Sequence, residues 1–238
     1  MFDFSGRVAL VTGAAGNLGR VVARGFQGAR ARTVLVDRDA MGLRQIFRDL
    51  QGSSDHVLAE GTDLMAPGAL EGLVSQAVEV FGRVDILVHT VGGFRAGQPL
   101  HETPMETWDL LLDLNLRTTV LAARAVVPTM LAQRFGKIVT VAARAALTGS
   151  ATLAAYSAAK AAVLRLTESL AAEVSHFGIN VNCVLPGTLD TPQNRQDRPD
   201  ADFSKWVAPE AVADVILFLA SDAARAVNGA AVPVYGLS

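Results

Sequence analysis

Short apolar runs rich in β-branched residues alternate with longer helical patterns along the whole chain. The runs are continuously apolar, not alternating with polar residues, which predicts strands covered on both faces. They span Val8–Thr12, Thr33–Asp37, Val57–Glu60, Asp85–His89, Gly136–Ala142, Asn180–Leu185 and Ala231–Tyr235. The helical patterns cover Leu18–Gln27, Met41–Leu50, Ala69–Phe81, Met105–Arg134, Leu153–Phe177 and Ala211–Ala220. This order predicts an α/β fold, a single-domain Rossmann-like doubly wound parallel sheet of about seven strands over residues 1–238.

Three features modify this pattern. Pro128 lies inside the longest helical pattern and should kink the helix near its end. The stretch 188–207 is rich in proline, aspartate and asparagine, and its length is typical of a lid or binding loop. A disordered surface segment is the alternative, although Phe203 and Trp206 give this stretch apolar side chains to pack. We expect 188–207 and the loop 93–103 to line a substrate pocket.

Composition narrows the possible partners and compartments. Half of the 238 residues are apolar, and the formal net charge is −2. The chain thus lacks the excess of positive charge that is typical of proteins that bind nucleic acid or an anionic membrane. The strongly apolar stretches, such as 215–220, are too short to span a bilayer, and the amino terminus does not resemble a secretory signal. The single cysteine, Cys183, fits a reducing compartment, so we expect a cytoplasmic protein.

A glycine-rich turn follows the first predicted strand and opens the first predicted helix. Its residues Gly13, Gly16, Asn17, Leu18 and Gly19 have the spacing of a dinucleotide-binding turn. Small residues let the backbone approach a pyrophosphate, and the helix amino end offers free N–H groups. Asn17 stands where a glycine is often found, and asparagine tolerates left-handed backbone angles. A purely structural strand–helix turn is the alternative interpretation.

Carboxylates after the second and third predicted strands indicate which dinucleotide binds. Asp37 lies twenty-four residues after Gly13, where it can accept ribose hydroxyls and would repel a 2′-phosphate. This favours NAD, although Arg38 could pair with a 2′-phosphate, so NADP stays possible. Asp63, followed by Leu64, could accept a hydrogen bond from the adenine amino group or could cap a helix.

Tyr156 and Lys160 stand one helical turn apart, so their side chains share a helix face. A free phenol has a pKa near 10, and a neighbouring ammonium lowers it by favouring the phenolate. The pair can therefore move a proton while a nicotinamide moves a hydride. An ordinary buried tyrosine with a satisfied hydroxyl is the alternative.

Taken together, the glycine turn, the two aspartates, Asn115, the Tyr156/Lys160 pair and Pro186-Gly187 resemble the short-chain dehydrogenase/reductase family in order and spacing, over essentially the whole chain. The resemblance implies that Lys160 also holds the nicotinamide ribose and that Asn115 holds a water in the proton path. It implies a homodimer or homotetramer. It places the remaining cofactor contacts at Gly92, Pro186, Gly187, Thr188 and Thr191. Asn115 could instead bond backbone within the core, and the two threonines could be caps.

The chain departs from the family at two places. His89-Thr90-Val91-Gly92 replaces the usual Asn-Asn-Ala-Gly, and Ala143 stands where a catalytic serine is usual. Thr148 and Ser150 are the nearest hydroxyls in sequence that could replace the serine. His89 is a lone histidine at a strand end, which is more often structural than a metal ligand, and the chain shows no metal-ligand spacing.

These observations support two functions. The first is an NAD(P)-dependent oxidoreductase of a small carbonyl or alcohol, or of a conjugated quinonoid. Segments 92–94, 188–195 and 201–206 resemble a pterin-reducing member of the family that also lacks the serine, so a pterin-like substrate is included. The second is an NAD(H)-binding sensor without chemistry, which the missing serine suggests. Retention of Tyr156 and Lys160 favours the enzyme, since fold alone cannot decide.

Overall fold

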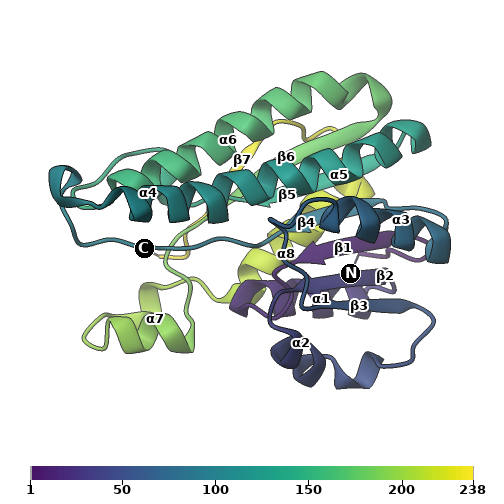
Figure 1. Ribbon diagram of the computed structural model, residues 1–238, viewed down its shortest axis with the longest axis horizontal. Coiled ribbons are helices and arrows are strands. Elements are labelled where there is room, and N and C mark those ends of the chain that lie inside the picture. Colours follow the sequence, from purple (N-terminus) through teal and green to yellow (C-terminus); the bar gives the residue numbers. More distant parts are fainter. Residues whose placement is uncertain (1, 238) are drawn as a thin grey trace.

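The computed structural model describes residues 2–237 and contains one parallel seven-stranded sheet (Figure 1). The strand order is β3-β2-β1-β4-β5-β6-β7. The strands are β1 (Val8–Thr12), β2 (Arg32–Asp37), β3 (His56–Glu60), β4 (Ile86–His89), β5 (Gly136–Val141), β6 (Ile179–Pro186) and β7 (Ala231–Val234). The predicted doubly wound sheet is confirmed. The order reverses between β1 and β4, where such sheets place their ligands.

Helices cover both faces of the sheet. They are α1 (Asn17–Gly28), α2 (Ala40–Ile46), α3 (Ala69–Phe81), α4 (Met105–Leu112), α5 (Thr118–Gln133), α6 (Ala154–Val174), α7 (Pro192–Asp197) and α8 (Pro209–Ala220). Alternate strand residues explain the two layers. Ala9 and Val11 of β1 pack with α1 and α8, whereas Val8 and Leu10 pack with α3, α5 and α6. Both cores are buried, which is why the inner strands β1 and β4 are almost entirely apolar.

The long helix expected over 105–134 is divided in the structure. A π-helical segment, Asp113–Arg117, separates α4 from α5. The expected kink site Pro128 lies inside α5, which continues as an α-helix to Gln133. The interruption therefore falls at the π segment instead of near the proline. Such π segments recur at functional sites because they change where side chains point.

The stretch 188–207 is ordered and contains α7 and a 3₁₀ turn at Phe203–Lys205. A bridge between Leu189 and Val207 closes its base. The Phe203 ring lies 4.8 Å from the Trp206 ring, and the Arg195 guanidinium lies 4.8 Å from the Phe203 centroid. Figure 1 shows α7 standing away from the sheet. The structure thus contradicts the disordered-segment alternative.

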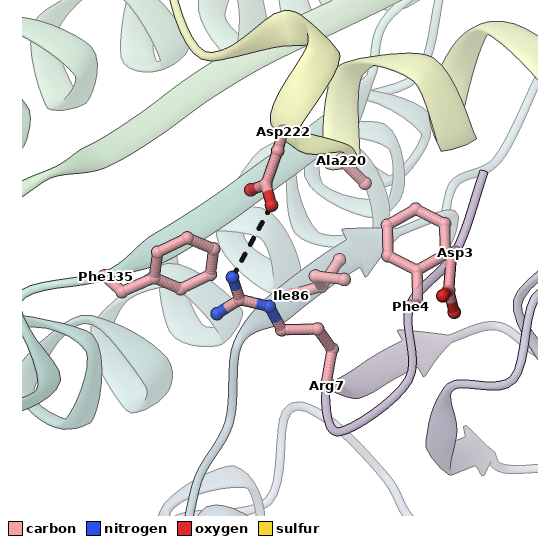
Figure 2. Close-up of a pocket in the computed structure, with 7 residues that line it drawn as sticks. All are labelled: Asp3, Phe4, Arg7, Ile86, Phe135, Ala220 and Asp222. Atoms are coloured by element: carbon pink, nitrogen blue, oxygen red, sulfur yellow. Dashed lines mark ion pairs between the residues drawn. The ribbon is translucent and has the colours of Figure 1, made fainter.

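A small cavity of about 10 Å³ lies at the opposite, amino end of the strands (Figure 2). The guanidinium of Arg7, just before β1, lies 3.9 Å from the Phe135 centroid. It pairs with Asp85 at 3.4 Å and Asp222 at 3.7 Å. The cavity has room for about one water molecule, so these residues fasten the amino-terminal segment to the sheet. Residues 2–237 include no helix long and apolar enough to cross a membrane.

Candidate active site

The carboxyl edge of the sheet brings the predicted site residues together. The glycine turn follows β1, Gly92 follows β4, and Pro186 ends β6. Tyr156 and Lys160 reach this edge from α6, whose packing partners include β5 and β6. Ligands of open α/β sheets bind at this edge.

The glycine turn forms a cradle that larger side chains would fill. Gly13 has a left-handed φ of +71°, and a methyl group there would lie 2.8 Å from Thr90 Oγ1. A methyl group on Gly19 would lie 2.0 Å from the Gly13 carbonyl oxygen. Gly16 precedes α1 without a side-chain cap, so the first-turn N–H groups stay available. This cradle fits the pyrophosphate of a dinucleotide.

The turn does not use the tolerance of Asn17 for left-handed backbone angles. Asn17 is the first residue of α1, and the left-handed position of the turn is Gly13. Leu18 follows as a buried residue that anchors the helix on the core. Helix α1 can begin at Asn17 because the chain has already turned at Gly13.

Asp37 lies directly beside the glycine turn. Its carboxylate accepts hydrogen bonds from Ala15 N and Asp39 N, both at 2.9 Å. Arg38 is exposed next to it. The Asp37 carbonyl accepts from Thr62 N at 3.1 Å, which brings the following Asp63 to the same corner.

Asp63 caps a turn, not a helix. Its carboxylate accepts from Met65 N at 2.9 Å, whereas α3 begins only at Ala69. Leu64 is buried between them. The carboxylate is exposed, so the capping hydrogen bond leaves its other oxygen open to a ligand.

Lys160 and Asn115 converge on Gly92. The buried Lys160 ammonium donates to the Val141 carbonyl at 2.9 Å. A methyl group on Gly92 would lie 2.8 Å from Asn115 Oδ1 and 3.2 Å from Lys160 Nζ. Asn115 also exchanges two hydrogen bonds with the Gly93 backbone, at 3.0 and 3.2 Å. Asn115 therefore makes the core backbone bonds of the alternative interpretation while lying beside Lys160.

The electrostatics of the pair differ from our expectation. Burial raises the pKa of Tyr156 to about 12. The Lys160 ammonium lies 6.0 Å from the Tyr156 ring centroid, and at that distance its attraction for a phenolate is outweighed by the loss of water around the phenol. Burial also lowers the pKa of Lys160 to about 8. At neutral pH, Tyr156 is a protonated phenol beside a cation.

Phe94 is a site residue that the sequence reasoning did not single out as a contact. Its ring meets Tyr156 edge-on, with centroids 4.9 Å apart, and its side chain is 47% exposed. The signal in the sequence was the Gly92-Gly93-Phe94 run. Thr90, which contributes its hydroxyl, and Val141, which contributes a backbone carbonyl, were also missed.

His89 is structural in this geometry. It is buried, and its ring nitrogens contact Thr12 Oγ1 at 2.8 Å and Thr118 Oγ1 at 3.1 Å. Burial and the nearby Lys160 charge lower the pKa of His89 to about 3, which keeps the ring neutral. Among residues 2–237, no group of three or more His, Cys, Asp or Glu side chains could hold a metal ion.

The residues after β6 carry the lid-like segment. Gly187 N donates to the Val234 carbonyl at 3.0 Å, and the Thr188 carbonyl accepts from Val207 N at 2.9 Å. Thr191 is buried and caps α7, accepting from Asn194 N at 3.2 Å. The cap alternative thus describes Thr191 in this structure.

The position of the usual serine offers no hydroxyl. Ala143 is extended and lies two residues beyond β5. Thr148 and Ser150 follow on an exposed segment before α6. This segment meets the loop 93–103, because Gly97 N donates to the Thr152 carbonyl at 3.1 Å.

Comparisons with known proteins point to one family over most of the chain. The family model described as short chain dehydrogenase matches residues 7–202. The chain is 37% identical to the (2S)-[(R)-hydroxy(phenyl)methyl]succinyl-CoA dehydrogenase subunit BbsD of Thauera aromatica, covering 97% of this chain and 95% of that protein. It is 36% identical to the 2-(R)-hydroxypropyl-CoM dehydrogenase of Xanthobacter autotrophicus, covering 97% of each. The crystal structure of levodione reductase aligns with a TM-score of 0.88 at 28% identity, covering 98% of this chain and 97% of that one.

Proposed function

Because this chain belongs to the short-chain dehydrogenase family and is an NAD(P)-dependent oxidoreductase of alcohols and carbonyl compounds, we propose that Tyr156 is its catalytic acid/base, working on a small carbonyl, alcohol or conjugated quinonoid. The observation that carries the proposal is the convergence of Lys160 and Asn115 on Gly92, with Tyr156 next to Lys160 and with Thr90, two residues before Gly92, against the glycine cradle. Phe94 adds an apolar wall next to the phenol.

In the reductive direction the protein supplies the proton. The nicotinamide, when bound, supplies the hydride. Tyr156 is protonated at neutral pH and donates to the substrate oxygen. The Lys160 ammonium stabilises the phenolate that remains and also holds the ribose hydroxyls. Asn115 holds a water through which Tyr156 regains its proton.

The proposed cofactor is NAD. The Asp37 carboxylate lies beside the cradle and would repel a 2′-phosphate. The residues that we assign to the dinucleotide are Gly13, Gly16, Asn17, Leu18, Gly19, Asp37, Arg38, Asp63, Leu64, Gly92, Tyr156, Lys160, Pro186, Gly187, Thr188 and Thr191. Arg38, if it pairs with a 2′-phosphate, would allow NADP.

The missing serine shapes the proposed substrate. Without a second donor at Ala143, the site suits a substrate that spreads developing charge by conjugation, such as a quinonoid pterin. Thr148 or Ser150 could instead supply the donor if their segment closes over the site. The named relatives are dehydrogenases of hydroxy compounds, which favours a simple alcohol/carbonyl pair over a pterin. The loops 93–103 and 188–207 would enclose the substrate within this one domain.

The test follows NADH oxidation optically with ketones, quinones and a quinonoid dihydropterin. We expect Tyr156→Phe to lose at least about a hundredfold in turnover, the usual contribution of a general acid, while still binding NADH through the other residues assigned to the dinucleotide. Tyr235→Phe, at the other tyrosine of the chain, is the matched control and should keep turnover.

The same experiment tests the alternative, an NAD(H)-binding sensor. That function is favoured by the missing hydroxyl at Ala143. Tight NADH binding without turnover on any substrate would support the sensor. Equal turnover by the wild type and Tyr156→Phe would refute the role that we give to the phenol.

A further inference from the structure

The buried imidazole of His89 has a role that the proposed chemistry does not use. The Thr118 hydroxyl donates to the Leu114 carbonyl at 2.7 Å, so its oxygen is free to accept from His89 Nε2–H at 3.1 Å. The other ring nitrogen, Nδ1, then accepts the proton of the Thr12 hydroxyl at 2.8 Å. One neutral tautomer satisfies all four groups in a single hydrogen-bonded chain.

The two ends of this hydrogen-bonded series, Thr12 and Leu114, lie in different parts of the site. Thr12 is the last residue of β1 and directly precedes Gly13 of the glycine cradle. Leu114 belongs to the π segment that also presents Asn115, and Thr118 follows that segment at the start of α5. Asn115 bonds Leu111 at 2.8 Å within the same helix. The imidazole thus contacts both the strand before the cradle and the helix that follows the π segment of Asn115.

We propose that His89 is a positioning residue that fixes the cofactor cradle and the π segment of Asn115 in one relative geometry. This inference rests on the proposed function. Neighbouring contacts support it, since Thr90 Oγ1 donates to the Thr12 carbonyl at 2.7 Å and so holds the same strand end from the next residue. A buried, fully bonded polar chain specifies geometry because any displacement leaves a group unsatisfied.

The two hydrogen bonds of the His89 ring can be removed separately by substitution. Thr118→Val removes the Nε2 contact; it should lower turnover about tenfold, as one lost hydrogen bond allows, with unchanged NADH affinity. Thr12→Val removes the Nδ1 contact and should weaken NADH binding about tenfold. His89→Leu should show both losses, and His89→Gln, which keeps a donor and an acceptor, should recover part of each.

A readout without turnover keeps this test separate from the proposed function. The NMR signal of the Asn115 side-chain amide should shift in Thr118→Val and His89→Leu but not in Thr12→Val. The matched control is Thr33→Val, which cuts a comparable threonine–histidine contact, Thr33 Oγ1 to His56 Nδ1 at 2.9 Å, between β2 and β3. It should lower thermal stability and leave both NADH affinity and turnover unchanged.

The outcomes separate clearly. If wild-type protein turns over no substrate, the proposed function fails, while NADH affinity and the Asn115 signal still decide the role of His89. If Thr118→Val, Thr12→Val and Thr33→Val all lose only stability, His89 is merely a core residue and the inference is overturned. The threonine variants can still overturn the inference even if His89→Leu does not fold.

Discussion

The ammonium of Lys160 is buried at the reacting edge, and its charge sets a pH limit on catalysis. Burial lowers the pKa of Lys160 from 10.5 to about 8. The cation is therefore present below pH 8 and lost as the pH rises through that value. We expect the NADH-dependent reduction rate to be level near neutrality and to fall above about pH 8, since the phenolate left on Tyr156 loses its partner.

The rate should be measured from pH 6 to 10 with saturating NADH. Lys137 offers the control, because it is also buried, bonds Asn180 and lies in β5 away from the site residues. The rate of Lys137→Gln should still fall above about pH 8. A wild-type profile that stays level to pH 10 would contradict the assignment. The shift also makes folding stability rise between about pH 8 and 10.5, because the unfolded chain binds more protons there.

A second prediction at the scale of the residue concerns Asp37. Asp37→Asn keeps an oxygen that can accept from Ala15 N but removes the charge. We expect NADPH binding to tighten relative to NADH by about tenfold, because repulsion of the 2′-phosphate is lost while Arg38 stays available. Fluorescence titration with both cofactors measures the ratio. Arg38→Ala is the counterpart and should weaken NADPH binding alone; an unchanged ratio in Asp37→Asn would argue against the role of the carboxylate.

Single residues also show which features of the site could be predicted from the sequence and which could not. Sequence reasoning predicted which residues lie at the carboxyl edge because the order of strands and helices places the glycine turn, Gly92 and Pro186 there. It could not tell that Gly13, and not Asn17, is the left-handed residue of the turn, because both residue types tolerate that conformation. It misjudged the pKa of Tyr156 because burial depends on residues distant in sequence, such as Phe94.

Helix α1 illustrates how an element constrains a site. A methyl group on Gly19 would lie 2.0 Å from the Gly13 carbonyl, so α1 can approach the turn only with glycine there. We expect Gly19→Ala to weaken NADH binding by at least about tenfold, since the cradle must open. Gly72→Ala, on the exposed side of α3 with nothing within 4 Å of the added methyl, is the matched control.

The control variant Gly72→Ala should change stability in a known direction. Gly72→Ala should leave NADH binding intact and raise the free energy of unfolding by about 0.5–1 kcal/mol, the difference between alanine and glycine in a helix. Urea unfolding and NADH titration of both variants give the comparison. Normal NADH affinity in Gly19→Ala would show that the turn is more pliant than its geometry indicates.

At the scale of elements, the strands were predictable and two helices were not. Apolar runs identified all seven strands: β1 and β4 are buried on both faces, and the edge strands β3 and β7 are partly buried but still carry apolar residues. The π segment at 113–117 left no trace in the hydrophobic period, since an extra residue in one turn shifts side chains without changing their type. Helix α7 was missed because it is short and polar, and it depends on the Thr191 cap and the Asp190–Arg195 ion pair.

At the scale of the whole molecule, helices α4 and α6 expose apolar and small side chains. Figure 1 shows α4 and α6 together on the outer side of the sheet, and the two helices pack against each other. On α4, Leu110 is 39% exposed and Met105 is 67% exposed. Ala158 on α6 is exposed and small, which would let a partner helix approach closely. We propose that this surface joins subunits of a homodimer or homotetramer.

The proposal predicts a solution mass of two or four times 25.0 kDa. Leu110→Lys should shift the protein toward the monomer, because a charge would be buried without a partner in the interface. Val80→Lys is the matched control, an exposed apolar residue on α3 with 53% exposure, and it should leave the mass unchanged. Light scattering after size exclusion measures all three proteins. A monomeric wild type would refute the assembly, and an oligomer unaffected by Leu110→Lys would place its interface on another surface.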